Sequence, residues 1–158
     1  MDNELYTRVL SRLQGLCSRR EYCSSEIYRK ALILAQDDES VATAVLDALK
    51  KDKFLDDFRY ASAFARDKSS LSGWGAGKIS FALKGKGIDS RTVELALKEI
   101  DGSAAGKKLD NVIAAKYRTL REDPQWKLKL IRFGLGRGYS YDEVKDSIGR
   151  ISSGDGLS

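Results

Sequence analysis

The glycine-rich segment at residues 73–79 comes closest to a known chemical motif, a phosphate-binding loop. It reads Gly73-Trp74-Gly75-Ala76-Gly77-Lys78-Ile79. A phosphate loop needs a glycine at the position of Ser72 and a hydroxyl side chain at the position of Ile79, to reach magnesium. Both are missing, and no strand is predicted before the segment. The motif therefore does not predict nucleotide hydrolysis.

Asp56 and Asp57 form a carboxylate pair that could in principle act as acid and base. Adjacent helical positions do not share a face, however, and no histidine or metal ligand accompanies them. Both stand where a helix begins, where free backbone N–H groups and the helix dipole favour carboxylates. We expect this pair to cap the helix rather than to catalyse.

Nucleophilic and metal chemistry have few candidates in this sequence. The chain has two cysteines, Cys17 and Cys23, and no histidine. Two cysteines alone do not make a zinc site, and neither has a histidine to activate it. We predict that the protein is not an enzyme, binds no metal or cofactor, and is a reduced cytoplasmic protein. No apolar run approaches the length needed to cross a bilayer.

Apolar side chains recur at helical spacing along almost the whole chain. In the first set, the spacing predicts a helix over about 4–16, a second that begins at Ser24 or Ser25, and a third that begins in the acidic stretch 37–40. In the second set, it predicts a helix over 56–70, a second that ends at Gly85, and a third that begins at Asp89 or Ser90. A third set covers Leu109 to Leu120, the stretch from Pro124 to Gly136, and a last helix capped by Ser140 or Asp142. No strand-like alternation appears, so the predicted class is all-α.

The second and third sets of helices repeat at an offset of 51 residues. Gly85-Lys86-Gly87 falls on Gly136-Arg137-Gly138. A period near fifty is typical of a repeat protein. We predict three tandem three-helix modules, 4–55, 56–101 and 102–151, stacked into an elongated, curved chain with a disordered tail at 152–158.

Two expectations concern the helix that follows Pro124. Proline suits its first turn, and the spacing places Leu128, Ile131 and Leu135 inward. Gly134 in its interior costs about 1 kcal/mol relative to alanine. The third module is therefore expected to be the mobile one.

The charge is mildly basic, with 28 basic and 23 acidic residues and a net charge of +5. An acid-free stretch with four basic residues lies between Pro124 and Tyr141, which indicates a polyanion or an acidic partner. Cations with interspersed rings can hold phosphates and stack on bases, although a solvated face is the commoner explanation for any single residue. Trp74, between two glycines, is the best candidate for a partner anchor. The candidate cations are Arg19, Arg20, Lys30, Lys68, Lys78, Lys84, Lys86, Lys127, Lys129, Arg132 and Arg137; the rings among them are Tyr22, Trp74, Trp126 and Tyr139.

Several segments together resemble the bacterial RecX family. The likeness extends over about residues 5–151 and is most specific in 50–97. The segments that carry it are Phe54-Leu55-Asp56-Asp57-Phe58-Arg59-Tyr60-Ala61, Gly73-Trp74-Gly75, Lys86-Gly87-Ile88, Arg19-Arg20-Glu21-Tyr22-Cys23-Ser24-Ser25-Glu26-Ile27 and Gly138-Tyr139-Ser140. Two departures are Tyr22-Cys23 before the first-module serine and the presence of glycine at both 134 and 136 in the third module.

The resemblance implies a protein of tandem three-helix repeats that modulates the RecA recombinase in DNA repair, recombination and the SOS response. Such proteins bind RecA and its filament on single-stranded DNA, and limit filament growth, strand exchange and ATPase activity without catalysis of their own. It places Gly73, Trp74, Gly75, Lys78 and Lys86 at the contact surface, with Arg19 and Arg20.

Two other functions stay open on the sequence. One is a helical-repeat nucleic-acid-binding protein that acts without RecA, with strong salt dependence because each phosphate contact releases counterions. The other is a scaffold for an unrelated protein. The small basic excess favours a protein partner, with weaker binding to DNA, and the expected oligomeric state is a monomer.

Overall fold

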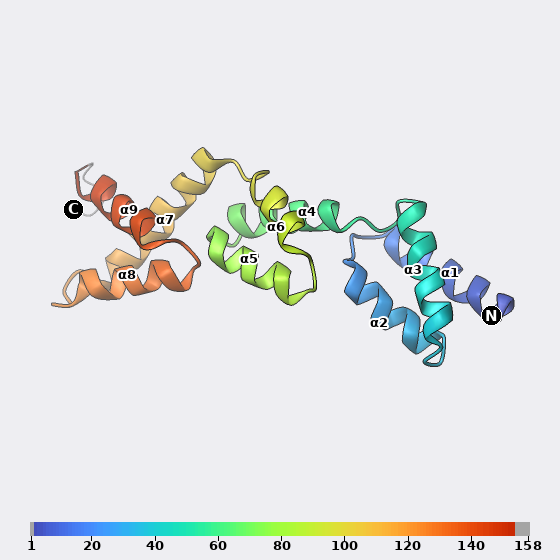
Figure 1. The fold of residues 1–158 in the computed structure, drawn as a ribbon. Coiled ribbons are helices and arrows are strands. Elements are labelled where there is room, and N and C mark those ends of the chain that lie inside the picture. The colour runs from blue at the N-terminus through green and yellow to red at the C-terminus, as the bar shows by residue number, and fades with distance from the viewer. Residues whose placement is uncertain (1, 154–158) are drawn as a thin grey trace. The chain divides into compact units, whose positions relative to one another are not determined.

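The structure is a computed structural model that describes residues 2–153. Within that range it contains helices and no strand, so the all-α prediction is confirmed (Figure 1). The helices are α1 (Asn3–Cys17), α2 (Ser24–Leu34), α3 (Glu39–Lys51), α4 (Asp57–Ser70), α5 (Ala76–Gly85), α6 (Ser90–Leu97), α7 (Gly102–Leu120), α8 (Trp126–Gly136) and α9 (Tyr141–Ser153). Ser152 and Ser153 end α9, which corrects the tail prediction there; residues 154–158 lie outside the described range.

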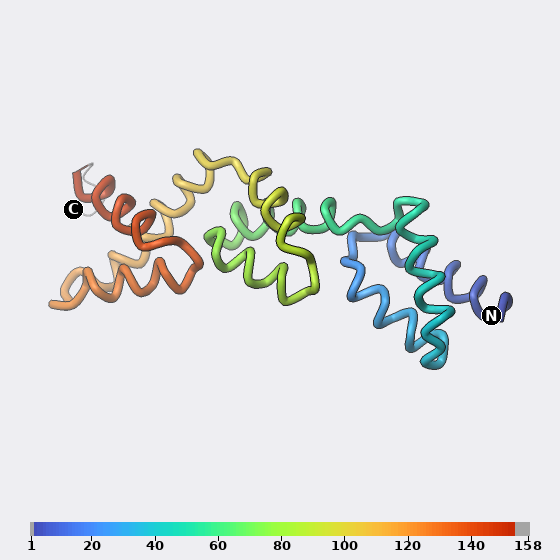
Figure 2. Tube along the Cα trace, viewed as in Figure 1, coloured from blue at the N-terminus to red at the C-terminus, as the bar shows by residue number. Residues whose placement is uncertain are grey.

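The chain forms two compact units. Unit 1 comprises residues 1–61 and 83–93, and unit 2 comprises residues 62–82 and 94–158. Each of the helices α4, α5 and α6 thus has residues in both units. These helices are the green and yellow-green part of the trace in Figure 2. The boundaries 4–55, 56–101 and 102–151 remain a prediction.

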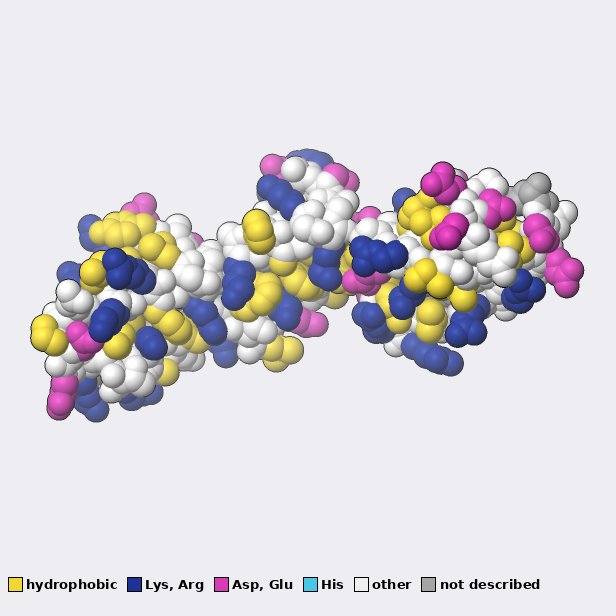
Figure 3. Space-filling view, turned by 90° about the horizontal axis from the view of Figure 1, so that it is seen from below, with side chains coloured by type: hydrophobic (Ala, Val, Ile, Leu, Met, Phe, Trp, Pro, Cys, Tyr) yellow, Lys and Arg dark blue, Asp and Glu magenta, His cyan; other side chains and the backbone are white. Residues whose placement is uncertain are grey.

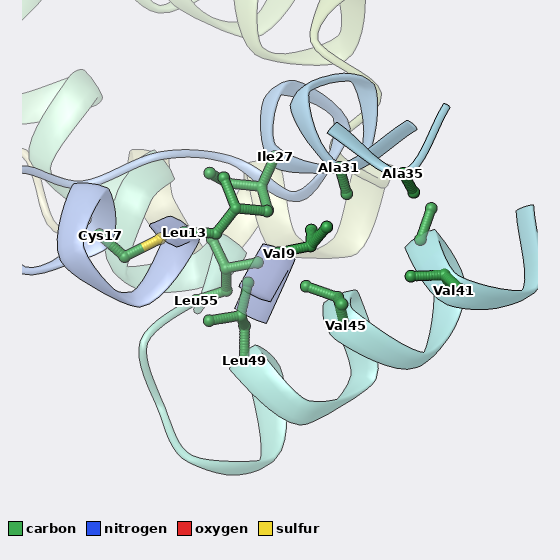
Figure 4. Packing of buried hydrophobic residues seen from close by; sticks show 11 residues of the cluster. Val9, Leu13, Cys17, Ile27, Ala31, Ala35, Val41, Val45, Leu49 and Leu55 are labelled. Carbon is green, nitrogen blue, oxygen red and sulfur yellow. The ribbon is translucent and has the colours of Figure 1, made fainter. Parts of the chain in front are cut away.

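Unit 1 is built on a core of small and medium apolar side chains from α1, α2 and α3. Val9, Leu13, Ile27, Val45 and Leu49 are buried and point toward one another (Figure 4). Each buried side chain of this size contributes about 1.5–3 kcal/mol of hydrophobic stabilisation. The helical spacing of these residues in the sequence is what brings them to one side of each helix.

Several helix N-termini are capped as the sequence predicts. The Asp38 carboxylate accepts from the N–H groups of Ser40 and Val41 at the start of α3, and Asp89 accepts from Thr92 N–H, 2.8 Å away, at the start of α6. Ser140 and Glu143 cap α9 reciprocally. These bonds satisfy donors that a helix leaves free in its first turn.

The start of α2 is capped differently from the prediction. Its N-cap is Cys23, and neither Ser24 nor Ser25 caps it with a side chain. Instead the Asp57 carboxylate, from α4, accepts the Ser24 N–H at 2.8 Å. Asp56 alone caps α4, through Arg59 N–H at 3.0 Å. The two carboxylates therefore serve two different helices, and both have a structural role.

In unit 2, helices α7, α8 and α9 pack on one another around Leu109, Ile113, Leu130, Val144 and Ile148. Asp110 on α7 also binds α9, because it accepts from the Ser147 hydroxyl and from the Arg150 guanidinium at 3.0 Å. This ion pair and the apolar core both hold α9 against α7.

The face that α8 buries differs in part from the predicted one, because Ile131 packs against the core of unit 2 as predicted but two leucines do not. Leu130 and Gly134 are buried, whereas Leu128 and Leu135 are 46% and 43% exposed. The helix begins at Trp126, so Pro124 lies in the turn before it rather than in its first turn. A Cβ atom on Gly134 would lie 2.5 Å from Val144 Cγ2. Glycine is therefore needed here for close packing of α8 on α9, which removes the reason for expecting a mobile third module.

The repeated glycines have equivalent roles in the two turns that the offset of 51 relates. Gly87 and Gly138 both have left-handed backbone, with φ of 81° and 96°. Glycine adopts this conformation without the steric cost that other residues meet. The sequence repeat thus corresponds to a repeated helix-ending turn.

Candidate partner-binding surface

The glycine-rich turn at 73–77 packs, backbone against backbone, on the turn that follows α8. Gly75 N–H donates to the Arg137 carbonyl at 2.7 Å, and Gly77 N–H donates to the Gly138 carbonyl at 3.0 Å. A Cβ atom on Gly75 would lie 2.4 Å from the Gly138 carbonyl carbon. These amides are occupied within unit 2, which is a further reason to reject a phosphate loop.

Gly73 and Gly75 are buried, so the structure places both in the interior of unit 2. A Cβ atom on Gly73 would lie 3.0 Å from an Arg137 guanidinium nitrogen. Their packing against other parts of unit 2 accounts for both glycines. A direct partner contact at either position stays a prediction.

Trp74 is half-buried and packs against side chains of its own unit. Its ring makes an edge-to-face contact with Phe64, with centroids 6.2 Å apart. The ammonium groups of Lys68 and Lys78 lie 4.7 and 4.5 Å from the centroid of the ring. Such cation–π contacts attract both ammonium groups to the ring beside the turn. Trp74, Lys68 and Lys78 therefore form one cation–aromatic cluster. The use of this cluster as a partner anchor stays a prediction.

Arg137 holds two segments of unit 2 together. Its guanidinium donates to the Ser72 carbonyl at 2.7 Å and lies 5.7 Å from the Phe133 ring centroid. Its Nε is buried without a hydrogen-bond partner among the described residues. This arrangement gives Arg137 a structural function in addition to the predicted contact.

Unit 1 carries a second cation–aromatic cluster around Tyr22. The Arg20 guanidinium carbon lies 3.8 Å, and the Lys30 ammonium 5.9 Å, from the ring centroid. Glu26, Arg29 and Ile33 complete a surface hollow of about 320 Å³ at this cluster. Arg20 and Lys30 are thus brought together as candidate contact residues.

Lys86, in the same unit, is bound to neighbouring side chains. Its ammonium lies 3.3 Å from the Glu26 carboxylate and 5.9 Å from the Tyr60 ring centroid. Burial lowers the pKa of Lys86, but hydrogen bonds to Tyr60 and Glu26 outweigh burial and raise it above its ordinary value. Lys86 therefore remains charged at neutral pH, with part of its charge balanced by Glu26.

The other candidate cations do not gather into one site. Arg19 and Lys84 are exposed in unit 1, and Lys127 and Arg132 are exposed in unit 2. Lys129 forms an ion pair with Asp123. On the face seen in Figure 3, Lys and Arg side chains lie among apolar ones. The predicted residues are therefore grouped by unit: Arg19, Arg20, Lys30, Lys84 and Lys86 in unit 1; Lys68, Gly73, Trp74, Gly75, Lys78, Lys127, Lys129, Arg132 and Arg137 in unit 2.

A regular aromatic repeat is visible in the sequence once the clusters are known. Tyr22, Trp74 and Trp126 are spaced by 52 residues each time. Tyr22 and Trp74 lie just before α2 and α5, and Trp126 is the first residue of α8. Trp126 makes an edge-to-face contact with Tyr117 at 5.2 Å between centroids. The glycine turns repeat at an offset of 51 residues, whereas these rings repeat at 52. An alignment of the glycine turns therefore leaves the rings one position out of register and hides the aromatic repeat.

No group of three or more potential metal ligands is found among residues 2–153, and no helix there is long and apolar enough to cross a membrane. Burial raises the pKa of the Cys17 thiol, and the nearby Glu21 carboxylate raises it further. A thiol held protonated is a poor nucleophile.

The fold and clusters define an all-α protein of repeated helical turns with cation–aromatic surface groups. Residues 56–97 match the family described as "RecX, second three-helix domain". The chain is 30% identical to the regulatory protein RecX of Chromobacterium violaceum over 135 residues, which cover 85% of each chain. The chain belongs to the RecX family, as the sequence resemblance predicts.

Other relatives agree on the family and on the fold. The chain is 37% identical to the regulatory protein RecX of Clostridium botulinum Eklund 17B over 124 residues, or 76% of this chain and 58% of the relative. It therefore spans little more than half the length of that relative. The crystal structure of RecX from Lactobacillus salivarius superposes with a TM-score of 0.86 and 20% identity, covering 94% of this chain and 97% of that one.

Proposed function

We propose that this protein is a non-enzymatic regulator of the RecA recombinase, acting in the cytoplasm as a monomer. Membership in the RecX family, through a relative aligned over 85% of each chain, carries the proposal. The proposed partner is the RecA filament on single-stranded DNA, with weaker binding to bare DNA. The expected effect is inhibition of filament growth, strand exchange and ATPase activity.

Such regulation needs no chemistry from the regulator. A binder shifts a filament between two states only if it has different affinities for them. A chain of helical turns that carries cations and rings at repeated positions could contact several filament subunits at once. The clusters around Tyr22 and Trp74 support this proposal, because Arg20, Lys30, Lys68 and Lys78 are held beside the rings.

Direct binding tests the proposal against the nucleic-acid alternative. Fluorescence anisotropy of labelled protein would compare preformed RecA filaments, RecA alone and bare single-stranded DNA at low and high salt. The proposal predicts tighter binding to the filament than to bare DNA, with a shallower salt dependence. Equal affinity for bare and RecA-coated DNA, falling steeply with salt, would establish the RecA-independent alternative instead.

A further inference from the structure

The exposed side of α2 carries a row of charged and apolar side chains. Four of its residues recur at helical spacing: Glu26, Arg29, Lys30 and Ile33. Positions three and four apart lie on one side of a helix, so these four side chains share one face. Ile27 and Ala31, on the other side of α2, are fully buried in the core of unit 1. The row therefore faces away from the core of its own unit.

This row borders the surface hollow of about 320 Å³, together with two residues of the segment before α2. We call it the Tyr22 hollow; its lining residues are Arg20, Tyr22, Glu26, Arg29, Lys30 and Ile33. All of them belong to unit 1. The three cations of the lining are exposed, and Ile33 is 71% exposed, so the hollow is open to a partner.

The uncompensated charge that lines the Tyr22 hollow is positive. Arg20, Arg29 and Lys30 form no ion pair with a carboxylate among residues 2–153. Glu26 is the one carboxylate in the lining, and its Oε1 atom lies 3.3 Å from the Nζ atom of Lys86, which does not line the hollow. Because Glu26 is already paired, the three cations stay without an opposite charge inside the hollow. The lining residues themselves therefore select an anion.

The ring of Tyr22 holds two of these cations at the hollow. The guanidinium carbon of Arg20 lies over the ring, 3.8 Å from its centroid, and the Lys30 ammonium lies 5.9 Å from it. A planar guanidinium loses few conformations when its N–H groups form paired bonds with a carboxylate. Arg20 is thus prepared to bind an anion in the hollow.

Two features favour a protein segment over a nucleic acid as the source of that anion. Single-stranded nucleic acids bind by stacking successive bases on exposed rings. Tyr22 is the one ring among the lining residues, and Arg20 already lies over it. Ile33 is aliphatic and gives a base no ring to stack on, but it gains from contact with an apolar side chain. The hollow therefore fits a segment that combines carboxylates with an aliphatic residue.

We propose that the Tyr22 hollow binds an acidic segment of a protein partner, with its carboxylates on Arg20, Arg29 and Lys30 and an aliphatic side chain against Ile33. A helical segment would present these groups at the same spacing as α2 does. The proposal rests on the proposed function only in treating the Tyr22 cluster as a partner contact. It adds the chemistry that the partner must offer there.

The experiment uses a designed peptide as the probe, with the intact protein and without RecA. The peptide has about 16 residues, long enough to form a helix, with Glu and Leu on one face. Amide chemical shifts of the labelled protein would be followed during titration, and we expect saturable shifts confined to residues 20–34. Arg29→Ala should weaken binding about tenfold, the factor expected for one lost charged hydrogen bond. Ile33→Ser should weaken it about fivefold, through lost apolar contact.

Matched controls separate the hollow from general attraction between opposite charges. Arg12→Ala removes an exposed cation of α1 that does not line the hollow, and should leave the affinity unchanged. Leu71→Ser removes a side chain that is 76% exposed and outside the hollow, and should also have no effect.

Three outcomes would overturn the proposal: absence of binding by the Glu peptide, equal effects of Arg29→Ala and Arg12→Ala, or equal effects of Ile33→Ser and Leu71→Ser. An oligothymidylate that shifts the same amides at lower concentration than the peptide would assign the hollow to nucleic acid instead. Because RecA is absent from this assay, each of these results leaves RecA regulation to be decided by its own experiment.

Discussion

The N–H of Gly75 donates to the carbonyl of Arg137 across 2.7 Å, which joins two residues far apart in the sequence. A related bond occurs in unit 1, where the Ser25 hydroxyl donates to the Lys86 carbonyl at 2.6 Å. Lys86 and Arg137 are equivalent in the repeat of 51. In both cases a carbonyl in the turn after one second helix, α8 or α5, accepts a hydrogen bond. The donor lies at the start of the second helix of the preceding set, α5 or α2.

The first prediction concerns Gly75→Ala. The new Cβ atom would lie 2.4 Å from backbone of Gly138, so unit 2 must shift. Overpacking of this kind costs about 1–3 kcal/mol in the free energy of unfolding, which urea denaturation would measure. Gly106→Ala in α7 is the matched control, because nothing lies within 4 Å of its Cβ position; it should stabilise by about 1 kcal/mol. Equal effects of the two substitutions would contradict the packing described for Gly75.

The second prediction concerns Gly134 and Val144, which face each other between α8 and α9. Gly134→Ala should lower the free energy of unfolding by about 1–3 kcal/mol, because its Cβ would lie 2.5 Å from Val144 Cγ2. In the Val144→Ala background the same substitution should have a much smaller effect. A double-mutant cycle measures this coupling, and strict additivity would rule out the direct contact.

The third prediction tests the cap that Asp57 provides to α2. Asp57→Ala removes the acceptor of the Ser24 N–H, and loss of a helix cap costs about 1 kcal/mol. Asp57→Asn keeps an acceptor oxygen and should lose less. Asp67→Ala, on an exposed position of the same helix, is the control and should not destabilise. Urea denaturation of the three variants would decide whether the cap contributes.

The fourth prediction is a loss of stability in acid. A backbone hydrogen bond from Thr92, followed by the Thr92 hydroxyl, lowers the pKa of Asp89 in the folded protein. A group with a lowered folded pKa stabilises above its unfolded pKa of about 3.9, and this contribution is lost as the pH falls. The urea midpoint should therefore fall between pH 5 and pH 3. Asp89→Asn, which caps without titrating, should show a smaller fall; an identical pH profile would contradict this role of Asp89.

The helices could be predicted from sequence because apolar spacing recurs along the chain and capping residues mark several of the N-termini. Asp38, Asp89 and Ser140 each stand directly before an apolar series and cap it. Asp57 could not be assigned in this way, because its partner Ser24 is 33 residues away and only tertiary packing brings them together. The apolar residues of α8 occur around its whole circumference, so periodicity alone could not select Leu130 and Gly134 over Leu128 and Leu135.

The candidate surface was harder to predict than the fold. Residue type identified Lys68, Trp74 and Lys78, but sequence does not show that the two lysines lie over the ring. Gly73 and Gly75 read as parts of an exposed turn, whereas close approach to residues 137 and 138 explains them. Phe81 lies off the face of α5 that buries Ile79 and Leu83, so helical spacing accounts for its exposure.

The most direct test of the proposed function is RecA ATPase activity on single-stranded DNA, with this protein added to preformed filaments in substoichiometric amounts. We expect wild type to lower the ATPase rate, and the charge reversals Arg20→Glu with Lys30→Glu to weaken that effect, while Asp67→Ala leaves it unchanged. An ATPase rate that stays constant up to a stoichiometric excess of wild-type protein would contradict RecA regulation.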